Sequence, residues 1–401
     1  MFLQKRFVLR FACSLSSILY ICFINVTTAN PLSTLVTKSS FFSNESLPQY
    51  ALDYAPYVYL HSEEAFWPSD INIHLVNSKP ESNYTVEASF SACGNNCRNF
   101  LRSSNLKLNV KDQGDVYLTS TSAIFDIEPQ SWLYGVGRPD QNGRSNAKAF
   151  IIAVDKTQQV GPGWVDVFYL FFYSYNQGNY FFNNRFGDHV GDWENTMIRF
   201  LNGKPVYITP EAHGGEVILG NSAYEIGVLE QLNGRPIVYS ANGTHGMYPQ
   251  PGTQNYTGLP IPIFDQTDKG YLWDPTMNYN AYFYSNENGF SYTGDIPVSQ
   301  QDPEQLGWLQ FMGYWGDQQY PVSEPRQTCI GSLCFYTSGP LGPQSKSLTR
   351  GWLCPSSDCK PQTSLPHIGL LTMNSPAIQI TPSFQALRIF MFSVVILLQF
   401  T

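Results

Sequence analysis

The segments RFLNGKPVYI (199–208) and EQLNGRPIVY (230–239) have nearly the same sequence, and each places Asn-Gly between two apolar runs. A type I′ turn needs a positive φ at both central residues, which asparagine and glycine tolerate best. Asn-Gly is therefore the strongest short-range signal of a β-hairpin. The copies begin 230 − 199 = 31 residues apart and predict two related hairpins in one sheet, although two copies are too few for a repeat architecture.

Strand-like runs rich in β-branched and aromatic residues occur along the whole body of the chain. They are YVYLH, YTVEASF, KAFIIAVD, VDVFYLFFYSYN, WENTMIRF, PVYIT and PIVYS. The 31 glycines and 27 prolines interrupt the chain at short intervals, and no long amphipathic helix is apparent. We therefore predict an all-β, sandwich-like fold with long loops.

Both ends of the chain are apolar, and we expect them to be targeting segments rather than parts of the fold. Residues 1–29 combine a basic opening, an apolar stretch and small residues before a cleavage position after Ala29, as in a signal peptide. The apolar run within 376–401 is too short to cross a bilayer comfortably. A polar spacer and the small residues Asn374 and Ser375 precede it, an order that predicts attachment of a glycosylphosphatidylinositol (GPI) anchor. A membrane-anchored helix is the alternative at each end.

The remaining chain is predicted to fold as one β-rich domain with an extension. A linker at 30–49 leads to the domain at 50–319, and the extension at 320–375 is rich in proline, serine, glycine and cysteine.

The charge of the mature chain restricts its partners. Removing both ends takes away Lys5, Arg6, Arg10 and Arg388 but no acidic residue, so 23 basic and 31 acidic residues become 19 − 31 = −12. This acidic balance argues against nucleic acid and anionic membrane surfaces as partners.

Cysteines and glycosylation motifs point to the secretory pathway. The cysteines left after signal removal form three close pairs, namely Cys93/Cys97, Cys329/Cys334 and Cys354/Cys359. Disulfides are the default in an oxidising compartment, and two of the pairs would staple the C-terminal extension. Zinc binding at CGNNC and CPSSDC is a weaker alternative, because a clean set of four ligands is missing. Glycosylation motifs begin at Asn44, Asn83, Asn242 and Asn255.

The segment GDHVGDWEN (187–195) concentrates acidic side chains in a chain with only 13% charged residues. In the first hairpin, cross-strand partners have numbers that add up to 202 + 203 = 405. This register places Glu194 opposite Glu211 and Asp192 opposite His213. Like charges opposite each other destabilise a strand pair, so we expect a cation, a shared proton or a basic neighbour between the glutamates.

The second hairpin adds one histidine to this group. Its partners add up to 233 + 234 = 467, which places Glu225 opposite Asn242, and His245 follows that strand. If the hairpins are neighbours, one rim carries His189, Asp192, Glu194, Glu211, His213 and His245.

Three interpretations of this rim remain open. Its ligands suit one divalent metal ion, either Zn²⁺ or, through oxygens alone, Ca²⁺ or Mg²⁺. Glu194, Glu211 and His213 are alternatively candidates for general acid–base hydrolysis. The third interpretation is a buried structural network. A shift in register by one residue, for example through a bulge at Pro210, would separate the group.

Other motifs carry weaker signals. His61 lies beside two glutamates at the end of an apolar strand, and Asp265 and Asp268 are candidates for cation binding, although an ordinary acidic turn is favoured. The G-x-S-x-G, H-E-x-x-H and phosphate-loop motifs are absent from the sequence. Every mature cysteine has a near partner, which argues against a thiol nucleophile.

Several of these stretches together resemble the vacuolar protein sorting-associated protein 62 family of fungi and plants. They are YAPYVYLHSEEAFWPSDI (54–71), FYLFFYSYNQGN (168–179), GDHVGDWENTMIRF (187–200), HGGE (213–216), PIVYSANGTHGMYPQPG (236–252) and DKGYLWDP (268–275). The resemblance covers roughly residues 50–315. This chain has Ser62 where the family pattern usually has proline, and Asn195 where it usually has histidine. The resemblance brings no agreed catalytic residues.

The resemblance implies a role in delivering proteins to the vacuole. A chain in the secretory lumen has no direct contact with cytosolic coats, so we expect a lumenal binding factor that is GPI-anchored at the vacuole or the cell surface. Its expected partner is a lumenal or cell-surface protein or glycan. The alternatives are a secreted, metal-dependent hydrolase of wall glycans or lipids and a structural surface protein, so enzymatic activity is left open.

Overall fold

Both Asn-Gly dipeptides form the predicted turns. The computed structural model describes residues 46–86, 115–124, 129–181, 184–212, 222–256, 263–294, 306–356 and 358–366. The φ angles are 50° and 76° at Asn202 and Gly203, and 52° and 80° at Asn233 and Gly234. These positive values are what a type I′ turn requires, so the local preference of the two residues sets each turn.

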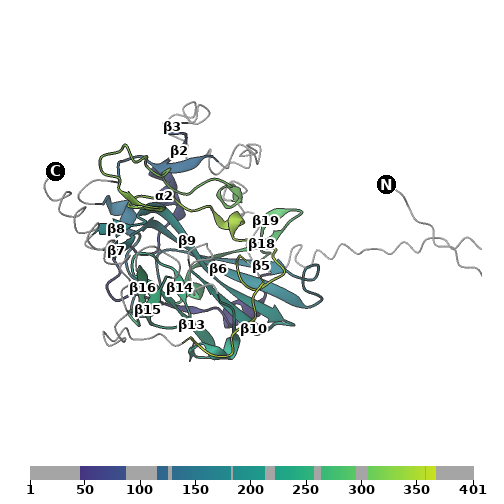
Figure 1. The fold of residues 1–401 in the computed structure, drawn as a ribbon. Helices are drawn as coiled ribbons and strands as arrows, with labels where there is room; N and C mark the ends of the chain where they lie inside the picture. Colours follow the sequence, from purple (N-terminus) through teal and green to yellow (C-terminus); the bar gives the residue numbers. More distant parts are fainter. Residues whose placement is uncertain are drawn as a thin grey trace, which may run out of the picture. The chain divides into compact units, whose positions relative to one another are not determined.

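The first hairpin belongs to a seven-stranded sheet with the order β11-β10-β9-β6-β5-β18-β19. Its strands are β5 (Ala149–Asp155), β6 (Trp164–Asn176), β9 (His189–Leu201), β10 (Lys204–Glu211), β11 (Tyr224–Glu225), β18 (Tyr279–Ser285) and β19 (Gly289–Tyr292). Strands β6 and β9 pair antiparallel along almost their whole length, and Figure 1 shows them crossing the middle of the sheet.

The second hairpin belongs to another sheet. This sheet has the order β12-β13-β1-β17, with β14 also paired to β13. Its strands are β1 (Tyr57–Leu60), β12 (Gln231–Leu232), β13 (Arg235–Ser240), β14 (Met247–Tyr248) and β17 (Tyr271–Trp273). The prediction that both hairpins share one sheet was therefore wrong, because β13 pairs in parallel with the distant strand β1, with Tyr57 beside Ile237.

The two sheets pack face to face. We call the surface of the seven-stranded sheet that carries Tyr169, Phe171 and Tyr173 its sandwich face. There the rings of Phe171 and Trp273 lie 5.0 Å apart, and the Tyr169 hydroxyl donates to the carbonyl of Ala51 at 2.6 Å. Side chains alternate between the faces of a strand, and both faces of β6 are buried from Val165 onward. The all-β, sandwich-like prediction is confirmed.

The opposite surface of the large sheet is covered by an aromatic core. Trp193 from β9 lies 5.2 Å from Trp315 and 6.0 Å from Trp308, centroid to centroid. Helix α2 (Ile71–Val76), the short helix η8 (Trp308–Gln310) and part of the C-terminal extension contribute side chains to the same core. We call residues 346–354 the strap and the surface below them the strap face.

Buried charges bind the strap to the sheet. Lys156 donates to the carbonyls of Leu348 and Arg350 at 2.6 and 2.9 Å. Arg199 forms two bonds to Asp166, at 2.6 and 2.8 Å, and a third to the carbonyl of Gly351. A buried charge is costly without partners, so these contacts make the strap part of the folded domain.

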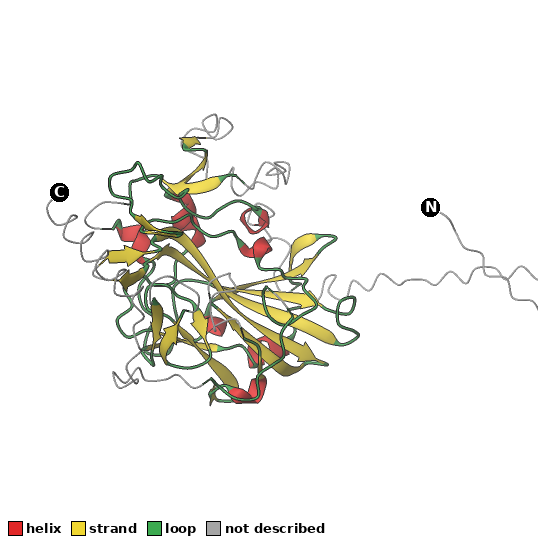
Figure 2. Cartoon of the chain, in the orientation of Figure 1, coloured by secondary structure: helices red, strands yellow, loops and turns green. Residues whose placement is uncertain are grey.

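Smaller elements surround the sandwich. In the described ranges, a three-stranded sheet has the order β3-β2-β4, and the two-stranded pairs are β7–β8, β15–β16 and β20–β21. Their bounds are β2 (Ser78–Ser82), β3 (Thr85–Val86), β4 (Tyr117–Ser120), β7 (Asn179–Phe181), β8 (Asn184–Phe186), β15 (Gly252–Asn255), β16 (Phe264–Thr267), β20 (Cys329–Ile330) and β21 (Leu333–Cys334). The other short helices are α1 (Gln49–Asp53), η2 (Ser131–Tyr134), η4 (Ile226–Val228), η5 (Pro275–Met277) and η9 (Pro343–Ser345). Figure 2 shows that the helices are short and lie around the strands.

Two of the predicted cysteine pairs form disulfides. Cys329 is bonded to Cys334 and Cys354 to Cys359, each across five residues, and they staple the C-terminal extension as predicted. Cys93 and Cys97 lie outside the described residues, as do Asn44 and both anchor candidates, Asn374 and Ser375. Disulfides of this kind indicate an oxidising compartment.

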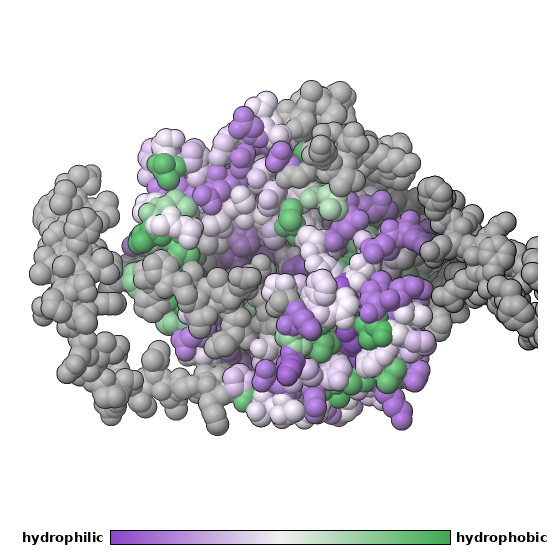
Figure 3. Space-filling model, turned by 45° about the vertical axis from the view of Figure 1, so that its right-hand side comes forward, coloured by the Kyte–Doolittle hydropathy of each residue, from purple (hydrophilic) through white to green (hydrophobic). Residues whose placement is uncertain are grey.

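In the described part of the chain, no helix is long and apolar enough to cross a membrane. Figure 3 shows hydrophilic side chains over much of the visible face, with the hydrophobic ones in separate small groups.

Candidate functional site

The first hairpin departs from the predicted register beyond its turn. Leu201 pairs with Lys204 and Phe200 with Pro205, as predicted, but Arg199 pairs with Tyr207. Val206 is the extra residue of this bulge, and every later pair is displaced by one position. Glu211 therefore lies opposite Asn195 rather than Glu194.

This displacement places the two glutamates on opposite faces of the sheet. A shift by one residue turns every side chain of a strand to the other face. Glu194 lies on the sandwich face, where its charge contributes to raising the pKa values of Tyr173 and Tyr248, both of which are raised mainly by burial. Glu211 lies on the strap face and binds Arg350 at 2.5 Å. The prediction that Glu194 and Glu211 are cross-strand partners was wrong.

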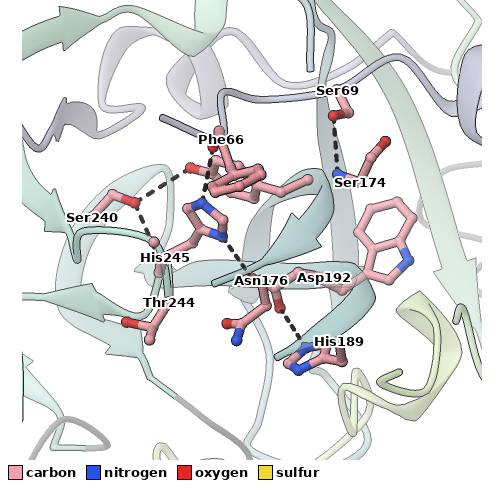
Figure 4. A network of polar contacts seen from close by, with 12 residues as sticks. Phe66, Ser69, Ser174, Asn176, His189, Asp192, Ser240, Thr244 and His245 are labelled. Atoms are coloured by element: carbon pink, nitrogen blue, oxygen red, sulfur yellow. Dashed lines mark hydrogen bonds and ion pairs between the residues drawn. The ribbon is translucent and has the colours of Figure 1, made fainter. Parts of the chain in front are cut away.

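Asp192 and His245, in contrast, do meet, although their hairpins lie in different sheets and the prediction had joined them through neighbouring hairpins of one sheet. His245 follows β13 and its ring is fully buried; its Nδ1 lies 2.9 Å from Oδ2 of Asp192, and its Nε2 lies 2.9 Å from the carbonyl of Phe66. Both oxygens accept, so both ring nitrogens donate and the ring is a cation. Figure 4 shows His245 held between Asp192 and Phe66.

The ring of His245 also stacks on Tyr173. The centroids are 3.7 Å apart and the planes differ by 6°. His245 has a φ of 57°, an uncommon conformation for a residue other than glycine. Its backbone carbonyl accepts from Ser240 at 3.3 Å. The residue is thus fixed by its backbone, by both ring nitrogens and by one ring face.

Glu64 supplies a second negative charge to this group. Its Oε1 lies 3.6 Å from Nε2 of His245 and accepts from the amides of Ala65 and Phe66. Its other oxygen accepts from the amide of Gly243, in the loop that carries His245. We call Glu64, Asp192, Tyr173 and His245 the His245 clamp. It connects the loop after β1, strands β6 and β9, and the loop after β13.

The pKa values agree with an ionised clamp. Burial by itself lowers the pKa of His245, but Glu64 and Asp192 outweigh it and raise that pKa to about 10. Burial by itself raises the pKa of Asp192, but the hydrogen bond from His245 and the nearby ring of His189 hold that pKa well below its usual range. The pair therefore stays charged from acidic to mildly alkaline pH.

Another buried carboxylate lies beside the clamp. Asp265 in β16 has no exposed surface. It accepts from Asn179 at 2.9 Å, Thr244 at 2.6 Å, Tyr248 at 2.7 Å and Tyr256 at 2.9 Å. Thr244 precedes His245, so the same loop contacts both carboxylate groups. Four hydrogen-bond donors explain how Asp265 is accommodated in the interior.

His189 lies at the edge of the same group. Its Nε2 is 3.9 Å from Asp192, and its Nδ1 contacts the carbonyl of Gly187 at 2.9 Å. Figure 4 shows Asn176 close to this pair, and the Asn176 side-chain amide donates to Gly187 as well. The side chain of His189 is more exposed than that of His245.

The predicted metal site does not assemble as a whole. His189 and His245 lie close to Asp192, which shares a face of the sheet with Glu194, whereas Glu211 lies on the opposite face and His213 is outside the described residues. Across the described ranges, no three histidine, cysteine or carboxylate side chains are arranged to hold a metal ion. The geometry best matches the third interpretation, a buried network.

The remaining predicted residues have separate environments. Ser62 donates through its amide and its hydroxyl to Asp268, and His61 lies 3.6 Å from the same carboxylate. Glu225 pairs with Tyr207 rather than with Asn242, because β12 is only two residues long. Among the glycosylation motifs, Asn83 and Asn255 are exposed and Asn242 is half-buried.

Sequence reasoning missed Glu64, Tyr173 and the four donors around Asp265. Glu64 stands next to Glu63 in an acidic loop, and nothing local distinguishes the buried glutamate from the exposed one. Tyr173 is one of many aromatics in β6. The usable signal was the sequence ANGTHG after a buried strand, which placed His245 near Asp192.

These features define a class of protein: a disulfide-containing β-sandwich whose histidine and carboxylate residues form an internal network. Residues 158–330 match the protein family described as "Vacuolar protein sorting-associated protein 62". A Saccharomyces cerevisiae protein named "Putative vacuolar protein sorting-associated protein TDA6" is 33% identical over 80% of this chain and 72% of its own length. "Vacuolar protein sorting-associated protein 62" of the same yeast is 32% identical over 81% of this chain and 71% of its own length. The chain belongs to the vacuolar protein sorting-associated protein 62 family.

Solved structures add no functional argument. "NLPPya in complex with glucosamine" covers 65% of this chain and 78% of its own, with a TM-score of 0.27 and 10% identity. "Toxin fold for microbial attack and plant defense" has the same coverage, with a TM-score of 0.26 and 10% identity.

Proposed function

We propose that this protein is a lumenal binding factor in the delivery of proteins to the vacuole. The names of two yeast relatives refer to vacuolar protein sorting, and the two disulfides agree with a protein of the secretory lumen. One observation favours binding over hydrolysis: both ring nitrogens of His245 and one oxygen of Asp192 are engaged inside the fold.

A hydrolytic acid or base must reach the substrate proton, directly or through one water. His245 has no exposed surface and Asp192 only 4%. In this proposal the clamp residues hold the two sheets together, and the outer loops contact the cargo. The cargo is a lumenal protein or its glycan, as the acidic net charge of the chain argues against nucleic acid.

Deletion of the gene tests the role in transport. We expect the deletion strain to release a vacuolar hydrolase into the medium, and we expect the wild-type gene to restore retention. A glycoprotein that is normally secreted serves as the control and should be unaffected. Normal retention of vacuolar hydrolases in the deletion strain would contradict the proposal.

Crosslinking in the lumen tests whether the role is direct. The tagged full-length protein should capture a vacuolar hydrolase precursor and not the secreted control glycoprotein. Hydrolysis of a wall glycan or lipid by the purified protein, abolished by Glu194→Gln in a folded variant, would instead support the enzymatic alternative.

Attachment to the membrane by a GPI anchor at Asn374 or Ser375 is part of the proposal. Phosphatidylinositol-specific phospholipase C should release the protein from washed membranes into the supernatant. Release by detergent alone would argue for a membrane-anchored helix.

A further inference from the structure

A further buried carboxylate, Asp317, lies far from the clamp in sequence, at the contact between the small sheet β3-β2-β4 and residues 314–320. We call this contact the 317 junction. The amide of Leu118 donates to the carbonyl of Tyr314 at 2.8 Å, and the amide of Tyr314 donates to Val116 at 2.9 Å. The rings of Tyr117 and Tyr314 stack at 4.5 Å with planes 6° apart. The segment is thus attached to β4 like a short additional strand.

Asp317 closes the junction at the end of β4. Its side chain is 2% exposed. Oδ1 accepts from the backbone amide of Ser120 at 2.6 Å, and Oδ2 accepts from the Tyr320 hydroxyl at 2.8 Å. Both donors are neutral, in contrast to the cations that accompany Asp166 and Glu211 on the strap face.

The charged groups around Asp317 give it little compensation. Glu81 and Lys79 act on it from β2, and Tyr320 acts from its own segment. The Lys79 ammonium is 2.7 Å from Glu81, so much of its charge is neutralised there. A carboxylate that is desolvated without a paired cation favours its protonated form. Burial accordingly raises the pKa of Asp317 to about 6, although Ser120 and Tyr320 oppose the shift.

We propose that the 317 junction is an acid-strengthened contact, which tightens when Asp317 takes up a proton in an acidic compartment. A protonated Asp317 no longer confines an uncompensated charge, and its new O–H can donate to the Tyr320 oxygen after that hydroxyl rotates. The junction is therefore weaker at neutral pH and stronger at the pH of an acidic lumen. The assumption that the protein meets an acidic lumen rests on the proposed function, whereas the pH response of the junction does not.

The sign of the effect follows from proton linkage. The folded protein binds this proton more tightly than the unfolded chain, in which an aspartate titrates near pH 3.8. The contribution of Asp317 to stability is fully present below pH 3.8 and is lost as the pH rises through about 6. One linked proton changes the unfolding constant by about tenfold per pH unit at most, which amounts to about a hundredfold over this window.

Hydrogen exchange and urea unfolding of the full chain between pH 4 and pH 8 test the proposal. In the wild type, the amide of Ser120 should become more protected as the pH falls, after correction for the intrinsic exchange rate. Asp317→Asn imitates the protonated acid. This variant should equal or exceed the wild type in stability at pH 7.5, lose that advantage near pH 4, and show a flat Ser120 response.

Two further variants separate this response from a merely structural role. Asp115→Asn changes an exposed carboxylate near β4 and should keep the wild-type pH response. Tyr320→Phe removes a donor that favours the ionised form, so it should move the midpoint of the Ser120 response to higher pH. The proposal is overturned if Asp317→Asn is less stable than the wild type at every pH, or if the Ser120 response in Tyr320→Phe keeps its wild-type midpoint.

Discussion

Asp192 and His245 show how much one buried ion pair can hold together. The pair joins strand β9 to the loop after β13, and Glu64 brings in the loop after β1. Asp192 is the closer of the two carboxylates beside buried His245, with Glu64 as the other, and removing one partner of a buried ion pair costs about 3–5 kcal/mol in known cases. The replacement Asp192→Asn should therefore lower the free energy of unfolding by about this amount in urea denaturation. Glu63→Gln, a change at an exposed neighbour of Glu64, should leave it nearly unchanged.

The same pair predicts loss of stability in alkali. The pKa of His245 in the folded protein, about 10, is raised above the ordinary histidine value of 6.5. Stability from this proton is fully present below pH 6.5 and is lost as the pH rises through about 10. Urea midpoints measured from pH 6 to pH 10.5 should fall across the interval from pH 6.5 to about 10 and level off above it. Asp192→Asn should flatten that fall, and an equally steep curve in the variant would contradict a charged clamp.

Ser62 shows how this chain accommodates one of its departures from the family pattern. Its amide and hydroxyl both donate to Asp268. Proline has no amide hydrogen and no hydroxyl, so Ser62→Pro loses both bonds, whereas Ser62→Ala loses one. We expect Ser62→Pro to lower the melting temperature more than Ser62→Ala, with a total cost of about 1–3 kcal/mol. If the wild type and both variants had the same melting temperature, the contact between Ser62 and Asp268 would contribute nothing to stability.

Residue-level prediction from sequence succeeded where the cause is local. Asn202 and Gly203 form their turn because both accept a positive φ, and this property belongs to the residues themselves. The bulge at Val206 has no comparable signal, and it decides which face Glu211 occupies. The turn was therefore predicted correctly, but the extra residue Val206 made the predicted pairing of Glu194 with Glu211 wrong.

At the scale of elements, the start of β9 depends on an unusually close backbone crossing. Gly191 has a φ of 69°, and a Cβ atom there would lie 1.9 Å from the carbonyl oxygen of Trp315. Gly316 and Gly339 meet the neighbouring carbonyl of Val190 in the same way. Three glycines thus let the segment before Asp317 pass directly against β9.

This crossing predicts a large difference between two glycine substitutions. Gly187→Ala also imposes a positive φ, but its Cβ would meet nothing within 4 Å, so it should cost about 1–2 kcal/mol. Gly191→Ala adds a backbone overlap and should cost more than about 4 kcal/mol. Thermal unfolding and the yield of secreted protein measure both, and similar values for the two variants would contradict the tight crossing.

Element-level prediction from sequence was good for strands and poor for their partners. The runs KAFIIAVD, VDVFYLFFYSYN and PIVYS became β5, β6 and β13 because apolar β-branched and aromatic residues favour buried strands. The assignment of both hairpins to one sheet failed because β13 pairs with β1, and long-range pairing leaves no periodic signal in either strand.

For the whole molecule, we expect the fold to depend on the strap. Lys156 and Arg199 share Asp166 as a partner within the large-sheet region, and they also donate to the carbonyls of Leu348, Arg350 and Gly351. These residues lie beyond 330, where the match to the family ends. From its composition, this region was predicted to be an extension rich in proline, serine and glycine. Its role in the fold could not be predicted, because it depends on backbone carbonyls, which leave no pattern in the sequence of side chains.

Two truncations test this dependence. A chain ending at residue 330 should fail to fold, because buried Lys156 and Arg199 lose the strap carbonyls to which they donate and keep only Asp166 between them. A chain ending at residue 366 keeps the strap and should fold. Circular dichroism and resistance to protease distinguish the two, and a folded protein ending at 330 would contradict a structural role for the strap.

The parallel contact between Tyr57 and Ile237 has a consequence for synthesis. The first strand of the fold must wait for a partner that emerges 237 − 57 = 180 residues later. Translation at about 5–20 residues per second makes that delay roughly 9 to 36 s. Throughout this interval the apolar strand YVYL lacks its partner in the nascent chain, so we expect chaperones to bind it until β13 has been translated.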